Sequence, residues 1–214
     1  MTTSASSAAL SGRRTYGTRS GVAAANSYRR AGQVLHATFF GPKLPNADVE
    51  NLALYYIDSF SIAGRNEKKL ALVWLALARG QVEVAVPTYK PETPFAVRVQ
   101  VRPQHGRQPV WGGLVKGIVD GVISAFQAHT DTTVLPHVVA QLAKVLPAEP
   151  VEIYKHLLDQ RRAALGVVQR LVKPFGAGVQ WNPADHWCVA GELLAADPVG
   201  PRWAIKGELI EVTR

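Results

Sequence analysis

Residues 112–129, GGLVKGIVDGVISAFQAH, constrain the fold more than any other stretch of this chain. On a helical wheel of about 100° per residue, their apolar side chains cover a broad arc. The polar side chains Lys116, Asp120 and Gln127 form only a narrow stripe. A helix on the surface of a soluble protein normally has a polar face about as wide as its apolar face. The pattern therefore predicts a central helix that is mostly buried.

Small residues recur every fourth position along this helix, at Gly113, Gly117, Gly121 and Ala125. A glycine inside a helix costs roughly 0.5–1 kcal/mol relative to alanine. Three of them in register indicate that another backbone packs closely against this side of the helix. Lys116 and Asp120 interrupt the apolar run, which is also shorter than the ~20 residues of a bilayer span. We expect a helix in a soluble core and no membrane partner.

Local periodicity predicts the remaining elements. Strands are expected at residues 33–40, 81–86, 95–101, 166–172, 187–194 and 202–212, and helices at 67–79, 134–145 and 149–164. Residues 49–60 fit a strand and a helix equally well. Strands and helices do not alternate one for one, which indicates an α+β class with a mainly antiparallel sheet packed against the central helix. A helical block and a C-terminal β-meander complete this expectation, with the last two strands joined as a hairpin through ADPVGP.

The first 32 residues are rich in Ser, Thr, Ala, Gly and Arg, and the first acidic residue of the chain is Asp48. Because this segment lacks a hydrophobic period, we predict a disordered basic arm at 1–32 followed by a single α+β domain at 33–214. The segment has no apolar core of a secretory signal. The single cysteine, Cys188, excludes an intrachain disulfide. These features, with the abundant alanine and arginine, favour a bacterial, cytoplasmic protein.

The formal net charge is +8. Such a charge suits a nucleic acid or an acidic protein as partner. The interpretation we favour is a non-enzymatic binding or assembly module that presents a basic surface to this partner. The expected contacts are arginines of the arm, of strand 95–101 and of the loop after it: Arg13, Arg14, Arg29, Arg30, Arg98, Arg102 and Arg107.

Carboxylates offer an alternative function. The eleven residues from Asp48 to Asp58 also contain Glu50. Asp120 lies four residues after Lys116, on the central helix. Clustered carboxylates bind Mg²⁺, which can generate hydroxide at a phosphodiester, and a lysine can stabilise the transition state. The candidate metal ligands are Asp48, Glu50, Asp58 and Asp120, and the candidate catalytic residues are Lys116 and Asp120. The other interpretation of Lys116 and Asp120 is a surface ion pair worth a few tenths of a kcal/mol.

The stretch DVENLALYYID resembles the D-x-D-N-x6-D signature of RusA-type Holliday-junction resolvases. The resemblance implies a small α+β, Mg²⁺-dependent, homodimeric endonuclease that acts on branched DNA. Glu50 replaces an Asp of that signature, and Leu54 stands where the family has a Lys. The family's K-x-x-x-D pattern occurs instead at Lys116 and Asp120. Three stretches, DVENLALYYID, KGIVDGVISAFQAH and WNPADHWCVAGELL, also resemble an actinobacterial family of proteins without assigned function, which implies no mechanism.

Overall fold

The structure is a computed structural model that describes residues 25–30, 33–40, 51–84, 93–106, 109–198 and 200–212. For the first two of these ranges it describes the strands but not the side chains. The predicted site residues Arg13, Arg14, Asp48, Glu50 and Arg107 lie outside the described residues.

The largest element is a seven-stranded sheet with the order β1-β2-β10-β5-β11-β3-β4. Its strands are β1 (Ala25–Arg30), β2 (Gln33–Phe40), β3 (Asn51–Phe60), β4 (Gln81–Val84), β5 (Phe95–Arg102), β10 (Cys188–Ala195) and β11 (Trp203–Glu211). Neighbouring strands are antiparallel except for β10 and β5, which are parallel. The α+β class with a mainly antiparallel sheet is therefore confirmed. Of the stretch 49–60, for which the sequence fits a strand and a helix equally, the described residues Asn51–Phe60 form a strand.

The helices are α1 (Asn66–Arg79), α2 (Val115–Ala125), α3 (Leu135–Ala143) and α4 (Pro150–Leu158). Short 3-10 helices lie at Trp111–Gly113 and Gln160–Arg162. Two small sheets accompany them: β6 (Ala128–His129) pairs with β7 (Val167–Val168), and β8 (Val172–Phe175) pairs with β9 (Gly178–Trp181). No helix in the described part of the chain is both long enough and apolar enough to cross a membrane.

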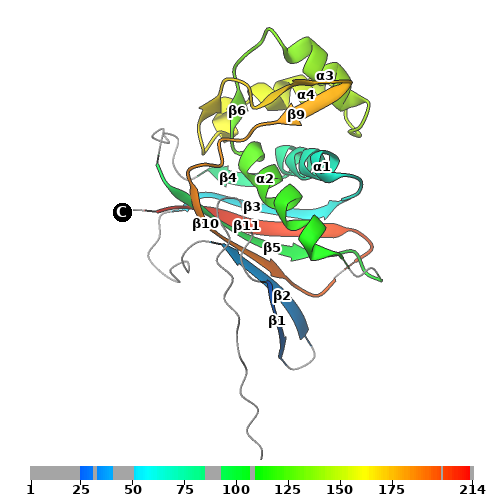
Figure 1. Ribbon diagram of the computed structural model, residues 1–214, viewed down its shortest axis with the longest axis vertical. Coiled ribbons are helices and arrows are strands. Elements are labelled where there is room, and N and C mark those ends of the chain that lie inside the picture. The colour runs from blue at the N-terminus through cyan, green and yellow to red at the C-terminus, as the bar shows by residue number, and fades with distance from the viewer. Residues whose placement is uncertain are drawn as a thin grey trace, which may run out of the picture.

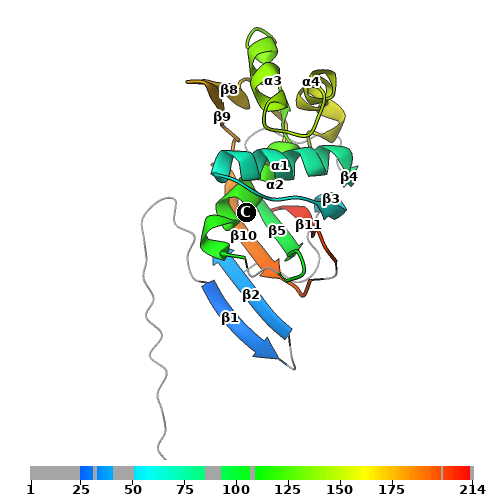
Figure 2. The same ribbon diagram turned by 90° about the vertical axis from the view of Figure 1, so that its right-hand side faces the viewer.

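The molecule is built in layers around α1. Figures 1 and 2 show α1 and α2 over one face of the large sheet, with α3, α4 and the β8–β9 hairpin on the far side of α1. Val73 and Leu77 of α1 join the core against the sheet, whereas Leu70 and Trp74 join a second core with the outer layer. The ring of Trp74 lies 5.3 Å from that of Trp181 on β9. Helix α1 therefore has apolar residues facing two layers.

The glycines of α2 face α1, as the sequence predicts. A Cβ added at Gly121 would lie 2.7 Å from the Cβ of Val73, and one at Gly117 would lie 3.0 Å from the Cβ of Lys69. At Gly113 the nearest atom would be the Nζ of Lys69, 3.7 Å away. The helix itself is buried along most of its length. The predicted close approach of another backbone is confirmed at Gly117 and Gly121, and the approaching element is α1.

Five features differ from the sequence expectation. The helix expected at 149–164 ends at Leu158 and is followed by the short 3-10 helix Gln160–Arg162. The strand expected at 166–172 is instead two short strands, Val167–Val168 and Val172–Phe175, in two different small sheets. Helix α2 ends at Ala125, because Gln127 turns to bind the backbone of Ala184 and Ala128 pairs with Val167. The last two strands do not form a hairpin, because β5 lies between β10 and β11. Strand β1 occupies part of the segment that we expect to be a disordered arm, and it pairs with β2.

Candidate basic groove on the open face of the sheet

Charged and polar side chains of the described strands lie on the face of the sheet turned away from α1 and α2. Along β5, Val97, Val99 and Val101 are buried in the core beneath the helices. Successive strand residues point to opposite faces, so Arg98, Gln100 and Arg102 lie on the other face. We call this second face the open face.

A row of charged residues crosses the middle of the open face. Arg98 pairs in register with Glu192 of β10 and with Glu208 of β11. Its Nε lies 2.9 Å from Oε2 of Glu192, and its Nη1 binds Oε1 of Glu208. Burial acts to lower the pKa of Arg98, but hydrogen bonds to the two glutamates raise it overall. Arg98, a predicted partner contact, is thus engaged inside the molecule.

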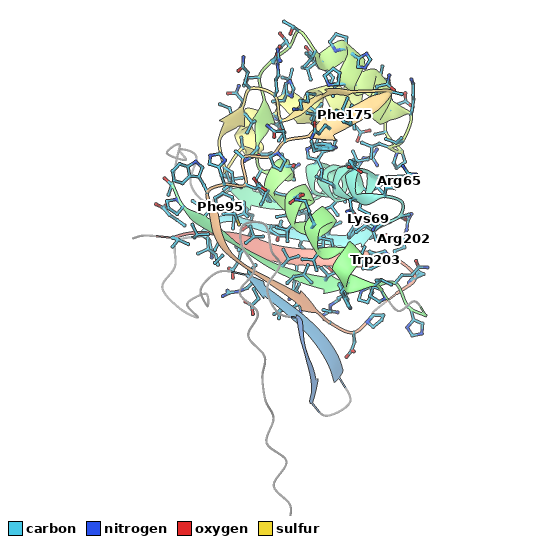
Figure 3. All side chains as sticks on the ribbon, viewed as in Figure 1. Arg65, Lys69, Phe95, Phe175, Arg202 and Trp203 are labelled. Carbon is cyan, nitrogen blue, oxygen red and sulfur yellow. The ribbon has the colours of Figure 1, made fainter. Side chains whose placement is uncertain are left out.

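A second row lies one step closer to the end of the strands. Tyr56, Lys206 and Gln100 are neighbours across β3, β11 and β5, and Arg102 faces Ala204 in the step after them. Arg202 directly precedes β11, and Figure 3 labels it at this end of the strand. A cavity of about 360 Å³ is lined by Tyr56, Asp58, Arg102, Arg202 and Lys206. We call these five residues the basic groove.

The cations of the basic groove have no salt-bridge partner among the described residues. Arg202 and Lys206 are exposed and Arg102 is half-buried. Within the described residues, none of the three forms a salt bridge. Asp58, the single carboxylate of the groove, is also exposed and unpaired there. Three positive charges and one negative charge leave a net charge of +2 on the groove.

A second cavity of about 510 Å³ adjoins the groove between β3 and α1. It shares Tyr56, Asp58 and Arg202 with the first cavity. Its own cation, Arg79, is already engaged, because its guanidinium binds both carboxylate oxygens of Glu152 and the carbonyl of Pro147. The unpaired cation of this second cavity is therefore Arg202, which it shares with the basic groove. A separate cavity between α1, α3 and β9 is lined by Arg65, Lys68 and Lys144, which also form no salt bridge with a described residue.

The predicted catalytic pair lies elsewhere, on α2. The Nζ of Lys116 is 2.7 Å from Oδ2 of Asp120, and the side chains are 68% and 15% exposed. Burial raises the pKa of Asp120, Lys116 acts against this shift, and nearby Asp185 adds to it. For Lys116, burial acts to lower the pKa, but Asp120 raises it overall. This geometry is the i,i+4 ion pair that forms one of our two interpretations.

Of the four predicted metal ligands, the structure describes Asp58 and Asp120, and these two lie in different parts of the molecule. Asp58 lines the basic groove, whereas Asp120 lies beside Lys116 and Asp185. No group of three or more His, Cys, Asp or Glu side chains in the described part of the chain is arranged to hold a metal ion. The approach of Asp48 and Glu50 to Asp120 stays a prediction, since both lie outside the described residues.

The remaining predicted contacts fall into two groups. Arg29 and Arg30 lie on β1, opposite Val34 and Gln33 of β2, and only their strand positions are described. Of the predicted contacts whose side chains the structure describes, Arg102 lies in the basic groove and Arg98 does not. Tyr56, Arg202 and Lys206 were not predicted. Alternation along residues 202–212 places Lys206 on the polar face of its strand, but which strands are neighbours depends on the whole sheet.

Comparison with protein-family models, curated proteins and solved structures finds no match.

Proposed function

We propose that this protein is a non-enzymatic binding module that holds a polyanionic partner in the basic groove. The observation that carries the proposal is the set of three cations, Arg102, Arg202 and Lys206, which line one cavity without internal salt bridges to described residues. Arg98 of the same sheet, in contrast, is neutralised by the carboxylates of Glu192 and Glu208. Cations left unpaired around a concave surface favour the approach of a negatively charged ligand.

Charge alone gives this groove only weak affinity. An exposed ion pair at 4 Å contributes about 1 kcal/mol in water. Three such contacts sum to about 3 kcal/mol, whereas a Kd of 1 mM corresponds to about 4 kcal/mol. Useful affinity therefore requires a further contact, from the groove or from the basic segment that precedes the domain.

The test replaces the three cations together, as Arg102→Gln, Arg202→Gln and Lys206→Gln. Binding to labelled oligonucleotides and to polyglutamate is measured by fluorescence anisotropy at two salt concentrations. We expect the triple variant to bind more weakly and with a flatter salt dependence than the parent, because fewer counterions are released. Its control is Lys68→Gln, Lys144→Gln and Lys155→Gln, three exposed lysines of α1, the turn after α3 and α4. Both variants lose three positive charges, so equal losses would refute the groove as the site.

Mg²⁺-dependent cleavage of branched DNA is the alternative function. One observation favours it: Asp185 lies close enough to Asp120 to raise its pKa, so two carboxylates share one region beside Lys116. Mg²⁺ is commonly bound in proteins by one or two carboxylates together with waters and substrate phosphates. Thermal melts of the parent and of Asp120→Asn, each with and without Mg²⁺, test this alternative.

A further inference from the structure

We infer that the polyanion is a single-stranded nucleic acid, with one base stacked on Tyr56 and the adjoining phosphates bound by Arg102, Arg202 and Lys206. This inference rests on the proposed function and adds the class of ligand. The stacked base supplies the further contact that the affinity requires beyond the three ion pairs.

Tyr56 is placed as a stacking surface. Its side chain is on the open face and is 52% exposed. The preceding residue differs sharply: Tyr55 points into the core, is 4% exposed and donates a hydrogen bond to the carbonyl of Arg98 at 3.0 Å. No described aromatic ring stacks on Tyr56. A large apolar ring left open beside free cations is the combination that binds bases and phosphates together.

Neighbouring charges determine where the phosphates can lie. The row next to Tyr56 holds Glu192, Arg98 and Glu208, and it continues through Leu54 to Glu83. Among the described residues, three carboxylates and one guanidinium leave this row with a net charge of −2. Phosphates are repelled from that row. On the other side of Tyr56 lie Arg102 and Arg202, toward the end of the strands. The ligand backbone is therefore held at this end of the sheet, with Lys206 beside the stacked base.

The exposed ring selects single strands over duplexes. In a duplex the faces of the bases are covered by their neighbours in the stack, so a side chain projecting from a sheet reaches only edges and phosphates. Unpaired bases can turn out and stack on an aromatic side chain. An acidic peptide would satisfy the three cations but would make no comparable use of the ring.

The experiment measures Kd by anisotropy for the full-length chain with three probes: single-stranded oligothymidylate, a duplex of equal length, and polyglutamate of equal charge. The variants are Tyr56→Leu, Tyr56→Phe and, as matched control, Tyr154→Leu. Tyr154 is an exposed tyrosine on α4, outside the groove. Base stacking on one aromatic side chain corresponds to a change of about 5- to 150-fold in Kd. We expect Tyr56→Leu to lose single-strand affinity by this factor, and Tyr56→Phe and Tyr154→Leu to bind like the parent.

The outcomes separate this inference from the proposed function. If Tyr56→Leu binds oligothymidylate like the parent while the triple cation variant does not, stacking is refuted and the polyanion site remains. Duplex or polyglutamate bound more tightly than the single strand likewise refutes the ligand class alone. If none of the three probes binds the parent, both proposals fail. Thermal melts of each variant establish that a lost affinity is not lost folding, since Tyr56 lies on the surface.

Discussion

Burial and pairing act in opposite directions on the single carboxylate of Asp120. Burial outweighs the contact with Lys116, so the pKa of this group is higher in the folded chain than in the unfolded one. The folded state then binds the proton more tightly, and ionising Asp120 costs stability as pH rises from the unfolded pKa through the folded one. The cost is absent below that window and fully present at neutral pH. The ion pair is thus weak support for the fold, as expected when one partner is largely exposed.

The variant Asp120→Asn tests this balance. We expect it to melt at the same temperature as the parent or higher at pH 7, and to lose any advantage as pH falls through the acidic range. Lys116→Met is the matched variant, and it should lower stability by less than about 1 kcal/mol because it leaves the carboxylate without its partner.

Melts with and without Mg²⁺ address the nuclease alternative, because a bound ion raises the melting temperature by mass action. A parent that does not respond to Mg²⁺ would end that alternative, and an Asp120→Asn variant that melts lower than the parent at pH 7 would contradict the balance described here.

At the scale of elements, the packing of α1 on α2 depends on two glycines. An alanine gains up to about 1 kcal/mol over glycine in helix propensity. At Gly121, however, the new Cβ would lie 2.7 Å from the Cβ of Val73 and 2.9 Å from the carbonyl oxygen of Leu70. Backbone cannot move away as a flexible side chain can, and overpacking of this kind typically costs about 1–3 kcal/mol.

We therefore expect Gly121→Ala to lower the free energy of unfolding despite its better helix propensity, by about 1–2 kcal/mol. Gly113→Ala is the control, because only the mobile Nζ of Lys69 lies within reach, 3.7 Å away. Urea unfolding of the two variants and the parent gives the comparison. Equal stabilities for the parent and Gly121→Ala would show that the two helices separate easily at this point.

Elements defined by local patterns were predictable from the sequence. Strand β2 has the predicted bounds. Helix α1 begins one residue before the predicted 67–79 and ends as predicted at Arg79, with Gly80 as its C-cap. Contacts that join distant residues were not predictable. The end of α2 depends on Gln127 binding Ala184, 57 residues away, which no periodicity reveals. The hairpin expected for the last two strands fails for the same reason, since local alternation does not show that β5 inserts between them.

At the scale of the whole molecule, the same limit applies to the site. Arg98 and Arg102 look alike in the alternation of β5, but the sheet places Glu192 and Glu208 beside Arg98 and leaves Arg102 in the groove. The residues of the groove come from β3, β5, β11 and the turn before β11, so their convergence follows from strand order. The sequence alone shows that the chain has a net positive charge. The order of the strands is needed to distinguish Arg98, which is paired with two glutamates, from Arg102, which has no salt bridge to a described residue.

The sequence before β2 combines an arginine-rich segment with a strand, and truncation separates the two. Removing residues 1–24 deletes Arg13, Arg14 and Arg19 and leaves β1 in place. If this segment contacts the ligand, we expect weaker binding to oligothymidylate, a salt slope reduced by at most about 2, and an unchanged melting temperature.

Removing residues 1–32 also deletes β1, which pairs with β2 over Ala25–Arg30. That variant should melt at a lower temperature and aggregate more readily, because β2 becomes an open edge. Binding that is identical with and without residues 1–24 would assign the affinity to the basic groove alone, and equal melting temperatures for the two truncations would show that β1 contributes nothing to the stability of the sheet.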